Sequence, residues 1–118
     1  MARDVKMTVN NNTGKVLRLK SKDPKHGKFT SSPPEIIEGS GSWTCTSKSA
    51  GLYGPEGTVT YETDDRNTTV EFYYNHPMGS ATSAYRVTPN PSDTMGSEIK
   101  GSFKGHSQDI TFELYLIP

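Results

Sequence analysis

Hydrophobic and polar residues alternate in short stretches along most of the chain. In residues 70–75, Val70, Phe72 and Tyr74 fall on one side of a two-residue repeat, and Glu71 and Tyr73 fall on the other. This alternation is typical of an antiparallel strand with one buried face. Because no stretch has the 3.6-residue period of an amphipathic helix, the pattern predicts an all-β protein.

Similar patterns recur throughout the chain, separated by short polar segments rich in Gly, Pro, Asn and Ser. The predicted strands cover about residues 3–10, 16–20, 28–30, 42–48, 58–63, 68–75, 81–88, 98–104 and 109–117. Residues 21–27 are polar and contain Pro24, so they predict a loop. We therefore expect residues 1–118 to form a single-domain antiparallel β-sandwich of two sheets, with roughly eight or nine strands.

The composition adds that the core must be thin. Only 31% of the 118 residues are hydrophobic, which is below the average for a globular domain. Intrinsic disorder is the alternative for so polar a chain. The recurring strand patterns and a formal net charge of zero argue against it.

Charge is unevenly distributed although it sums to zero. Residues 1–30 hold eight Lys and Arg against two Asp, whereas residues 31–75 hold seven acidic residues against two basic ones. The two regions either pair across the sheets or leave a basic face for phosphate headgroups or an acidic partner. No basic run is interleaved with aromatic residues, so nucleic acid is not an expected partner.

Cys45 is the only cysteine, so no disulfide within the chain is expected, which suits a reducing compartment. The first residues lack the apolar run of a signal peptide, and no stretch has the length of a membrane-spanning helix. We therefore expect a soluble protein made without a signal peptide, which reaches any membrane from solution.

The sequence contains little that indicates catalysis. It lacks the G-x-S-x-G and H-E-x-x-H motifs and the glycine-rich phosphate loops. His26, His76 and His106 are far apart and lie in predicted loops, which favours ordinary surface histidines over a metal site. We expect no enzyme activity, no cofactor and no metal; a hydrolase would need a site assembled only in space.

The most distinctive stretch is the corner at residues 75–80, where Pro77 and Gly79 interrupt the alternation. Four of the eleven aromatic residues, Phe72, Tyr73, Tyr74 and Tyr85, lie on the two predicted strands beside it, and Tyr and Trp favour the membrane interface. Phe72 and Tyr74 share a face with Val70 and should lie in the core. The residues that we expect to be exposed for recognition are Tyr73, His76, Met78 and Tyr85.

Two further aromatic positions bear on a recognition surface. Trp43 is either a core residue or a surface aromatic, since the pattern of residues 42–48 allows both. Leu52 and Tyr53 form an apolar pair in a glycine-rich loop that precedes Glu56, and they are expected to be exposed.

Residues 72–87, F-Y-Y-N-H-P-M-G-S-A-T-S-A-Y-R-V, resemble the signature of the aegerolysin family, in which an aromatic-rich strand leads into a P-x-G-S loop and a second aromatic strand. The segments 9–19, 27–33 and 54–61 are similar to the small component of binary insecticidal crystal toxins, a bacterial branch of that family. The resemblance extends over nearly the whole chain, and these segments occur in the order and spacing of the family.

The resemblance implies a β-sandwich that binds membrane lipids or a membrane receptor and forms pores with a larger, separate toxin component. Self-association on membranes and extracellular action at target cells, after production in the cytoplasm or a crystal inclusion, are further expectations. The positions that match the lipid-facing signature are Tyr74, His76, Pro77, Met78, Gly79, Ser80 and Tyr85, and Glu56 matches an acidic lipid-contacting residue. Fungal members carry Trp at positions 74, 78 and 85 and Cys at 76, so this chain fits the insecticidal branch better.

Together these observations predict a non-enzymatic, haemolysin-like insecticidal toxin component. Its membrane- or receptor-binding residues are expected among the matched positions together with Tyr73 and Trp43. A lectin-like sandwich that uses the same aromatic residues as platforms for sugar rings is the alternative.

Overall fold

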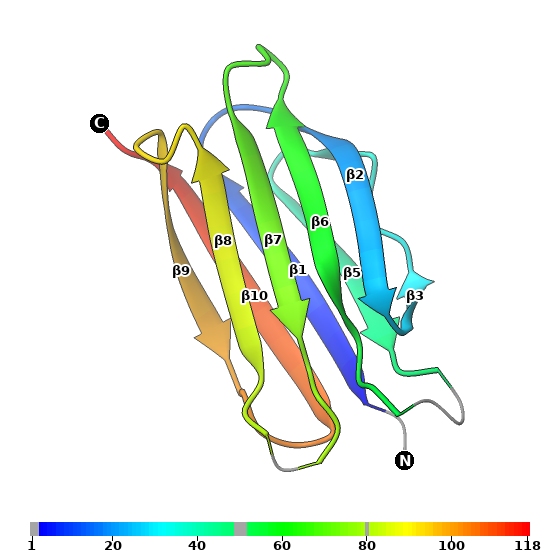
Figure 1. The fold of residues 1–118 in the computed structure, drawn as a ribbon. Helices are drawn as coiled ribbons and strands as arrows, with labels where there is room; N and C mark the ends of the chain where they lie inside the picture. Colours follow the sequence, from blue (N-terminus) through cyan, green and yellow to red (C-terminus); the bar gives the residue numbers. More distant parts are fainter. Residues whose placement is uncertain (1–2, 49–51, 80) are drawn as a thin grey trace.

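Two five-stranded sheets face each other in the computed structural model, which describes residues 3–48, 52–79 and 81–118 (Figure 1). Sheet 1 has the strand order β3-β5-β1-β10-β9, and sheet 2 has the order β4-β2-β6-β7-β8. The strands are β1 Asp4–Asn12, β2 Leu17–His26, β3 Lys28–Ser31, β4 Ile36–Ile37, β5 Ser40–Thr46, β6 Glu56–Thr63, β7 Thr69–Asn75, β8 Ala84–Asn90, β9 Met95–Gly101 and β10 Ser107–Leu116. The predicted β-sandwich is confirmed.

Within the described residues, neighbouring strands are antiparallel except for β1 and β10, which run parallel from Asp4 opposite Ser107 to Asn12 opposite Tyr115. The sheet edges are β3 and β9 in sheet 1 and β4 and β8 in sheet 2. The structure has ten strands over these residues, because a two-residue strand, β4, covers the start of β2.

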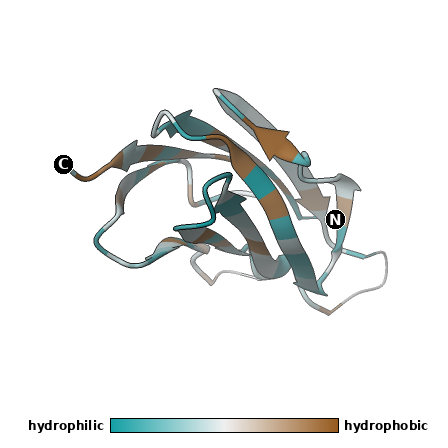
Figure 2. Cartoon of the chain, turned by 90° about the horizontal axis from the view of Figure 1, so that it is seen from above, coloured by the Kyte–Doolittle hydropathy of each residue, from teal (hydrophilic) through white to brown (hydrophobic). Residues whose placement is uncertain are grey.

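The core lies between the sheets and follows the alternation of the sequence. Hydrophobic and hydrophilic residues succeed one another along the strands in Figure 2. Trp43 is fully buried, and its ring centroid lies 5.8 Å from that of Phe72 and 6.4 Å from that of Tyr61. Phe72 also packs against Phe112, at 5.1 Å. Trp43 is therefore a core residue, and its assignment to a membrane-binding surface is wrong for this conformation.

The predicted loop at residues 21–27 is wrong, since β2 continues through that segment to His26. Most of the segment is exposed, and β4 covers β2 only at Leu17 and Arg18. The strand is held by backbone pairing with β6 and contains two register shifts, one of them after Pro24. An exposed strand near a sheet edge does not need alternating hydrophobic and polar residues, and it tolerates proline. The sequence of residues 21–26 therefore contains no hydrophobic pattern from which a strand could be predicted.

The sandwich is elongated, with extents of 43 × 22 × 21 Å. One end, here called the corner end, contains the β7–β8 connection and lies at the bottom of Figure 1. The opposite end, called the hairpin end, contains the β6–β7 turn at residues 64–68 and lies at the top. None of the described residues belongs to a helix with the length and hydrophobicity needed to cross a bilayer.

Replacing Phe72 with Ala is expected to lower the free energy of unfolding by about 3–5 kcal/mol, because it removes the ring that joins the aromatic residues of both sheets. Urea unfolding followed by Trp43 fluorescence measures this change. Glu71→Ala, at the exposed neighbouring position, is the control. A loss below about 1 kcal/mol for Phe72→Ala would contradict the assigned core.

Candidate functional site

The corner end is formed by loops that pack against one another. The backbone N–H of His76 donates to the carbonyl of Pro55 at 2.9 Å, which joins the β7–β8 connection to the loop before β6. A Cβ atom at Gly54 would lie 1.8 Å from the carbonyl oxygen of His76. Only glycine allows so close an approach of two backbones. The two loops therefore form a single surface.

His76 lies inside this end, with a side chain only 2% exposed. Its Nε2 is 2.8 Å from the carbonyl oxygen of His106, and its Nδ1 is 3.1 Å from Oγ of Ser83. A carbonyl only accepts hydrogen bonds, so Nε2 carries the proton, and Nδ1 of the neutral ring accepts from the Ser83 hydroxyl. His76 thus ties the β7–β8 connection to the β9–β10 connection.

The exposure predicted for His76 is wrong, since its ring is used to join loops. Burial, the largest cause, lowers its pKa below the ordinary value. Its partners Ser83 and His106 lie seven and thirty residues away in sequence, so no local pattern announces the contact.

Tyr85 is also buried, at 8% exposed, and the prediction that it lies on the surface is wrong. It stands opposite Tyr74 in the β7–β8 register, and directly opposed residues of antiparallel strands share a face. Tyr74 is buried, so Tyr85 points inward as well, and its hydroxyl donates to Oε1 of Gln108 at 2.6 Å. Neither ring reaches the surface in this conformation, although both were assigned to the lipid-facing set.

Tyr73 points to the opposite, outer face of sheet 2 and is half-buried there. Its hydroxyl donates to Oε2 of Glu56 at 2.7 Å, and the Arg86 guanidinium lies 4.2 Å from its ring centroid. Burial first, and the neighbouring Glu56 carboxylate second, raise the pKa of Tyr73. Tyr73, Glu56 and Arg86 therefore form a charged cluster on the outer face of sheet 2, beside the corner.

The most exposed apolar side chains at this end are in the loop before β6. Leu52 is 84% exposed and Tyr53 is 59% exposed. With half-buried Pro77 and Met78 they border a cavity of about 260 Å³ that also includes His26, Gly54, Glu56 and Asn75. We call Leu52, Tyr53, Pro77 and Met78 the apolar tip.

Tyr53 is the most exposed aromatic ring at the corner end, and it stacks on the His26 ring with a centroid distance of 4.1 Å. The sequence indicated an exposed Leu52–Tyr53 pair. It did not indicate that this pair lies beside Met78, because more than twenty residues separate them.

The other side of the corner carries a second, smaller cavity of about 170 Å³. Its lining includes Arg3, Gly79 and half-exposed Phe103. The Arg3 guanidinium donates to the carbonyl of Gly79 at 3.1 Å, which holds the start of the chain against the corner. Ser80, assigned to the site by sequence, lies outside the described residues.

No protein-family model and no curated protein sequence matches this chain. Several solved structures are similar to it. The lipid-binding protein Nakanori is 15% identical with a TM-score of 0.81, over 95% of this chain and 70% of that one. RahU, in complex with a Tris molecule, is 12% identical with a TM-score of 0.79, over 98% and 96%. IP-1A from Alcaligenes faecalis is 15% identical with a TM-score of 0.73, over 98% and 92%.

At these identities the similarity shows a shared fold. The aegerolysin-like sandwich that the sequence resemblance implies is confirmed as the architecture of this chain.

The buried His76 predicts that stability falls in mild acid. Its folded-state pKa lies below the ordinary value of about 6.5, so the unfolded chain takes up this proton first. The free energy of unfolding should decrease as the pH falls through 6.5 toward the folded-state pKa, and this contribution should level off below it. Urea unfolding at several pH values, compared between the wild type and His76→Gln, isolates the effect because His26 and His106 remain in both. Identical pH profiles for the two proteins would contradict the assignment.

Proposed function

We propose that the protein binds lipid membranes through the apolar tip at its corner end. The observation that carries this proposal is the exposure of Leu52 and Tyr53, the two most exposed large hydrophobic side chains among the described residues, beside Met78. Exposed apolar groups gathered at one end of a soluble fold mark a surface that contacts an apolar partner. The similarity in fold to a protein described as lipid-binding supports the same assignment.

The tip has the chemistry of an interfacial contact. Leu52 and Met78 are apolar and enter the acyl boundary, while the Tyr53 ring sits at headgroup depth with its hydroxyl hydrated. Full burial of a large apolar side chain contributes about 1.5–3 kcal/mol. Burial of Leu52 and Met78 in the membrane would therefore give a binding free energy of only a few kcal/mol, which is enough for reversible attachment to a bilayer. The His76 hydrogen bonds hold the loops in place, so little ordering is needed when they bind.

The Glu56 carboxylate gives this surface a preference for a lipid headgroup that carries a positive charge. Its carboxylate borders the same cavity as the tip and already accepts a hydrogen bond from Tyr73. An ammonium bound beside Glu56 would also lie near the aromatic pair of His26 and Tyr53, and aromatic faces attract such cations. A zwitterionic phospholipid headgroup carries such an ammonium next to its phosphate.

We further propose that this is a non-enzymatic toxin component that forms pores together with a larger, separate protein. The resemblance of residues 9–19, 27–33, 54–61 and 72–87 to the small component of binary insecticidal toxins supports this role. In such a pair, the chain described here recognises the target membrane and recruits the larger component to it. Attachment and perforation would then be separate activities of the two proteins.

The triple variant Leu52→Ala, Tyr53→Ala, Met78→Ala is expected to bind zwitterionic phospholipid vesicles at least about tenfold more weakly, because it removes the apolar side chains of the tip. Vesicle co-sedimentation measures the affinity. The double variant Leu116→Ala, Ile117→Ala removes half-exposed apolar residues at the other end of the molecule and serves as the matched control.

Undiminished binding by the tip variant, or an equal loss in the control variant, would remove the tip from the mechanism. Binding to glycans that persists without lipid would instead support the lectin-like alternative.

The toxin-component role predicts that release of a trapped dye from these vesicles requires both proteins. The chain alone should bind without releasing dye, and addition of a candidate larger partner should cause release. The tip variant should reduce release in proportion to its loss of binding. Complete release by this chain alone would contradict the division of roles.

A further inference from the structure

Another cavity lies at the hairpin end, far from the apolar tip. Its volume is about 340 Å³, and it lies beside the start of β2, the end of β6 and the β6–β7 turn. Three cationic side chains contribute to it: Arg18 and Lys20 from β2, and Arg66 from the turn. The other residues around it are Leu19, Glu62, Thr63 and Asp64.

The carboxylates near this cavity leave the two arginines unpaired. Glu62 lies 3.8 Å from Lys20, and Asp65 is 2.7 Å from Lys15. Over residues 3–48, 52–79 and 81–118, neither Arg18 nor Arg66 has a carboxylate oxygen within 4.0 Å. With Glu62 and Asp64 counted against the three cations, the lining keeps a net positive charge.

Arg66 has an unusual backbone conformation for its residue type. Its φ is 64°, in the left-handed region that favours glycine and, after it, asparagine and aspartate. The next residue, Asn67, is of a type that this conformation prefers. An arginine in such a position gives the backbone no advantage over glycine, which makes its side chain a candidate for a functional role.

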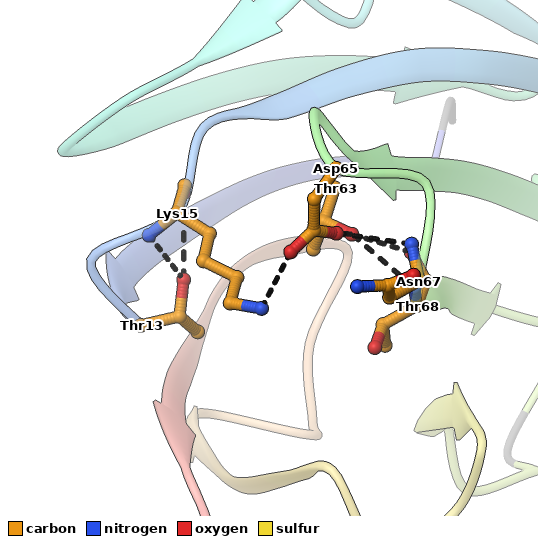
Figure 3. Close-up of polar contacts among 6 residues, drawn as sticks. All are labelled: Thr13, Lys15, Thr63, Asp65, Asn67 and Thr68. Atoms are coloured by element: carbon orange, nitrogen blue, oxygen red, sulfur yellow. Dashed lines mark hydrogen bonds and ion pairs between the residues drawn. The ribbon is translucent and has the colours of Figure 1, made fainter.

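Hydrogen bonds of the turn impose this conformation (Figure 3). One oxygen of Asp65 accepts from the Thr63 hydroxyl at 2.6 Å and from the backbone N–H of Asn67 at 2.9 Å, while Lys15 contacts the other oxygen. The N–H of Arg66 donates to the carbonyl of Thr63 at 2.8 Å. The Arg66 side chain takes no part in these hydrogen bonds. The turn therefore fixes the Arg66 backbone and leaves the guanidinium group available to bind a ligand.

We propose that this cavity binds an oxyanion, a phosphate or sulfate group, between Arg18, Lys20 and Arg66. Guanidinium groups present paired N–H donors that match the geometry of such oxygens, and Lys20 adds a mobile positive charge. The site lies beyond the proposed membrane function, because it occupies the end of a 43 Å molecule opposite the tip. A protein attached to a bilayer by its tip therefore keeps this cavity in solution, where a soluble phosphate or sulfate ester reaches it.

The test uses inorganic phosphate and inorganic sulfate as probes, with binding followed by NMR titration. The wild type should show saturable shifts at Arg18 and Arg66. Arg66→Gly should weaken binding about tenfold, because it removes one of two guanidinium groups. Glycine is the preferred residue at a φ of 64°, so this variant should unfold at the same temperature as the wild type or a higher one. A loss of binding with retained stability cannot come from misfolding.

Lys48→Ala, which removes an exposed positive charge outside the cavity, is the control and should bind as the wild type does. Arg18→Ala should weaken binding as Arg66→Gly does. Absence of saturable binding, or equal affinity of the wild type and Arg66→Gly, would overturn the proposal.

Vesicles of anionic lipid identify the source of the oxyanion. If Arg66→Gly binds them as the wild type does, the natural ligand is soluble; if it binds them more weakly, the ligand is a headgroup phosphate. The vesicle test of the tip does not involve these residues, so either proposal can fail without the other.

Discussion

The structure depends on the contact between two thin sheets through a small set of aromatic rings. Phe72 touches Trp43 and Tyr61 on one side and Phe112 on the other, so one residue of sheet 2 connects the inner strands of both sheets. A chain with 31% hydrophobic residues has few others to place there. The apolar side chains that stay outside this contact are correspondingly informative, because burying them would have strengthened the core.

The packing between the two sheets also explains why only some of the residues that match the lipid-facing signature lie at the surface. Alternation continues to the last residues of β7 and the first of β8, so Tyr74 and Tyr85 extend the core to the corner end. Tyr73, between two inward residues, points out toward Glu56 and Arg86. Only loops can carry apolar groups beyond the sheet ends, which is why the tip consists of Leu52, Tyr53, Pro77 and Met78.

The sequence predicts the structure correctly where buried side chains determine it. It does not predict the structure where backbone pairing or a contact with a distant residue determines it. The inward rows of β1, β7 and β10 were predicted because their burial requires a two-residue period. The second half of β2 has no buried face, so its pairing with β6 left no such pattern. The burial of His76 depends on Ser83 and on the His106 carbonyl, and the cavity with Arg18 and Arg66 depends on strand neighbours. Contacts of this kind appear only when the chain is folded.

The parallel pairing of β1 with β10 has a consequence for how the protein is made. β10 lies between β1 and β9, so sheet 1 stays divided until β10 has left the ribosome. The two partners are about a hundred residues apart in sequence, and contacts of that separation slow folding. β1 therefore gains its permanent neighbour on that side only after strands β2 to β9 have been made. In the interval that edge of β1 has unpaired backbone N–H and C=O groups, which are the groups through which strands of different copies can pair.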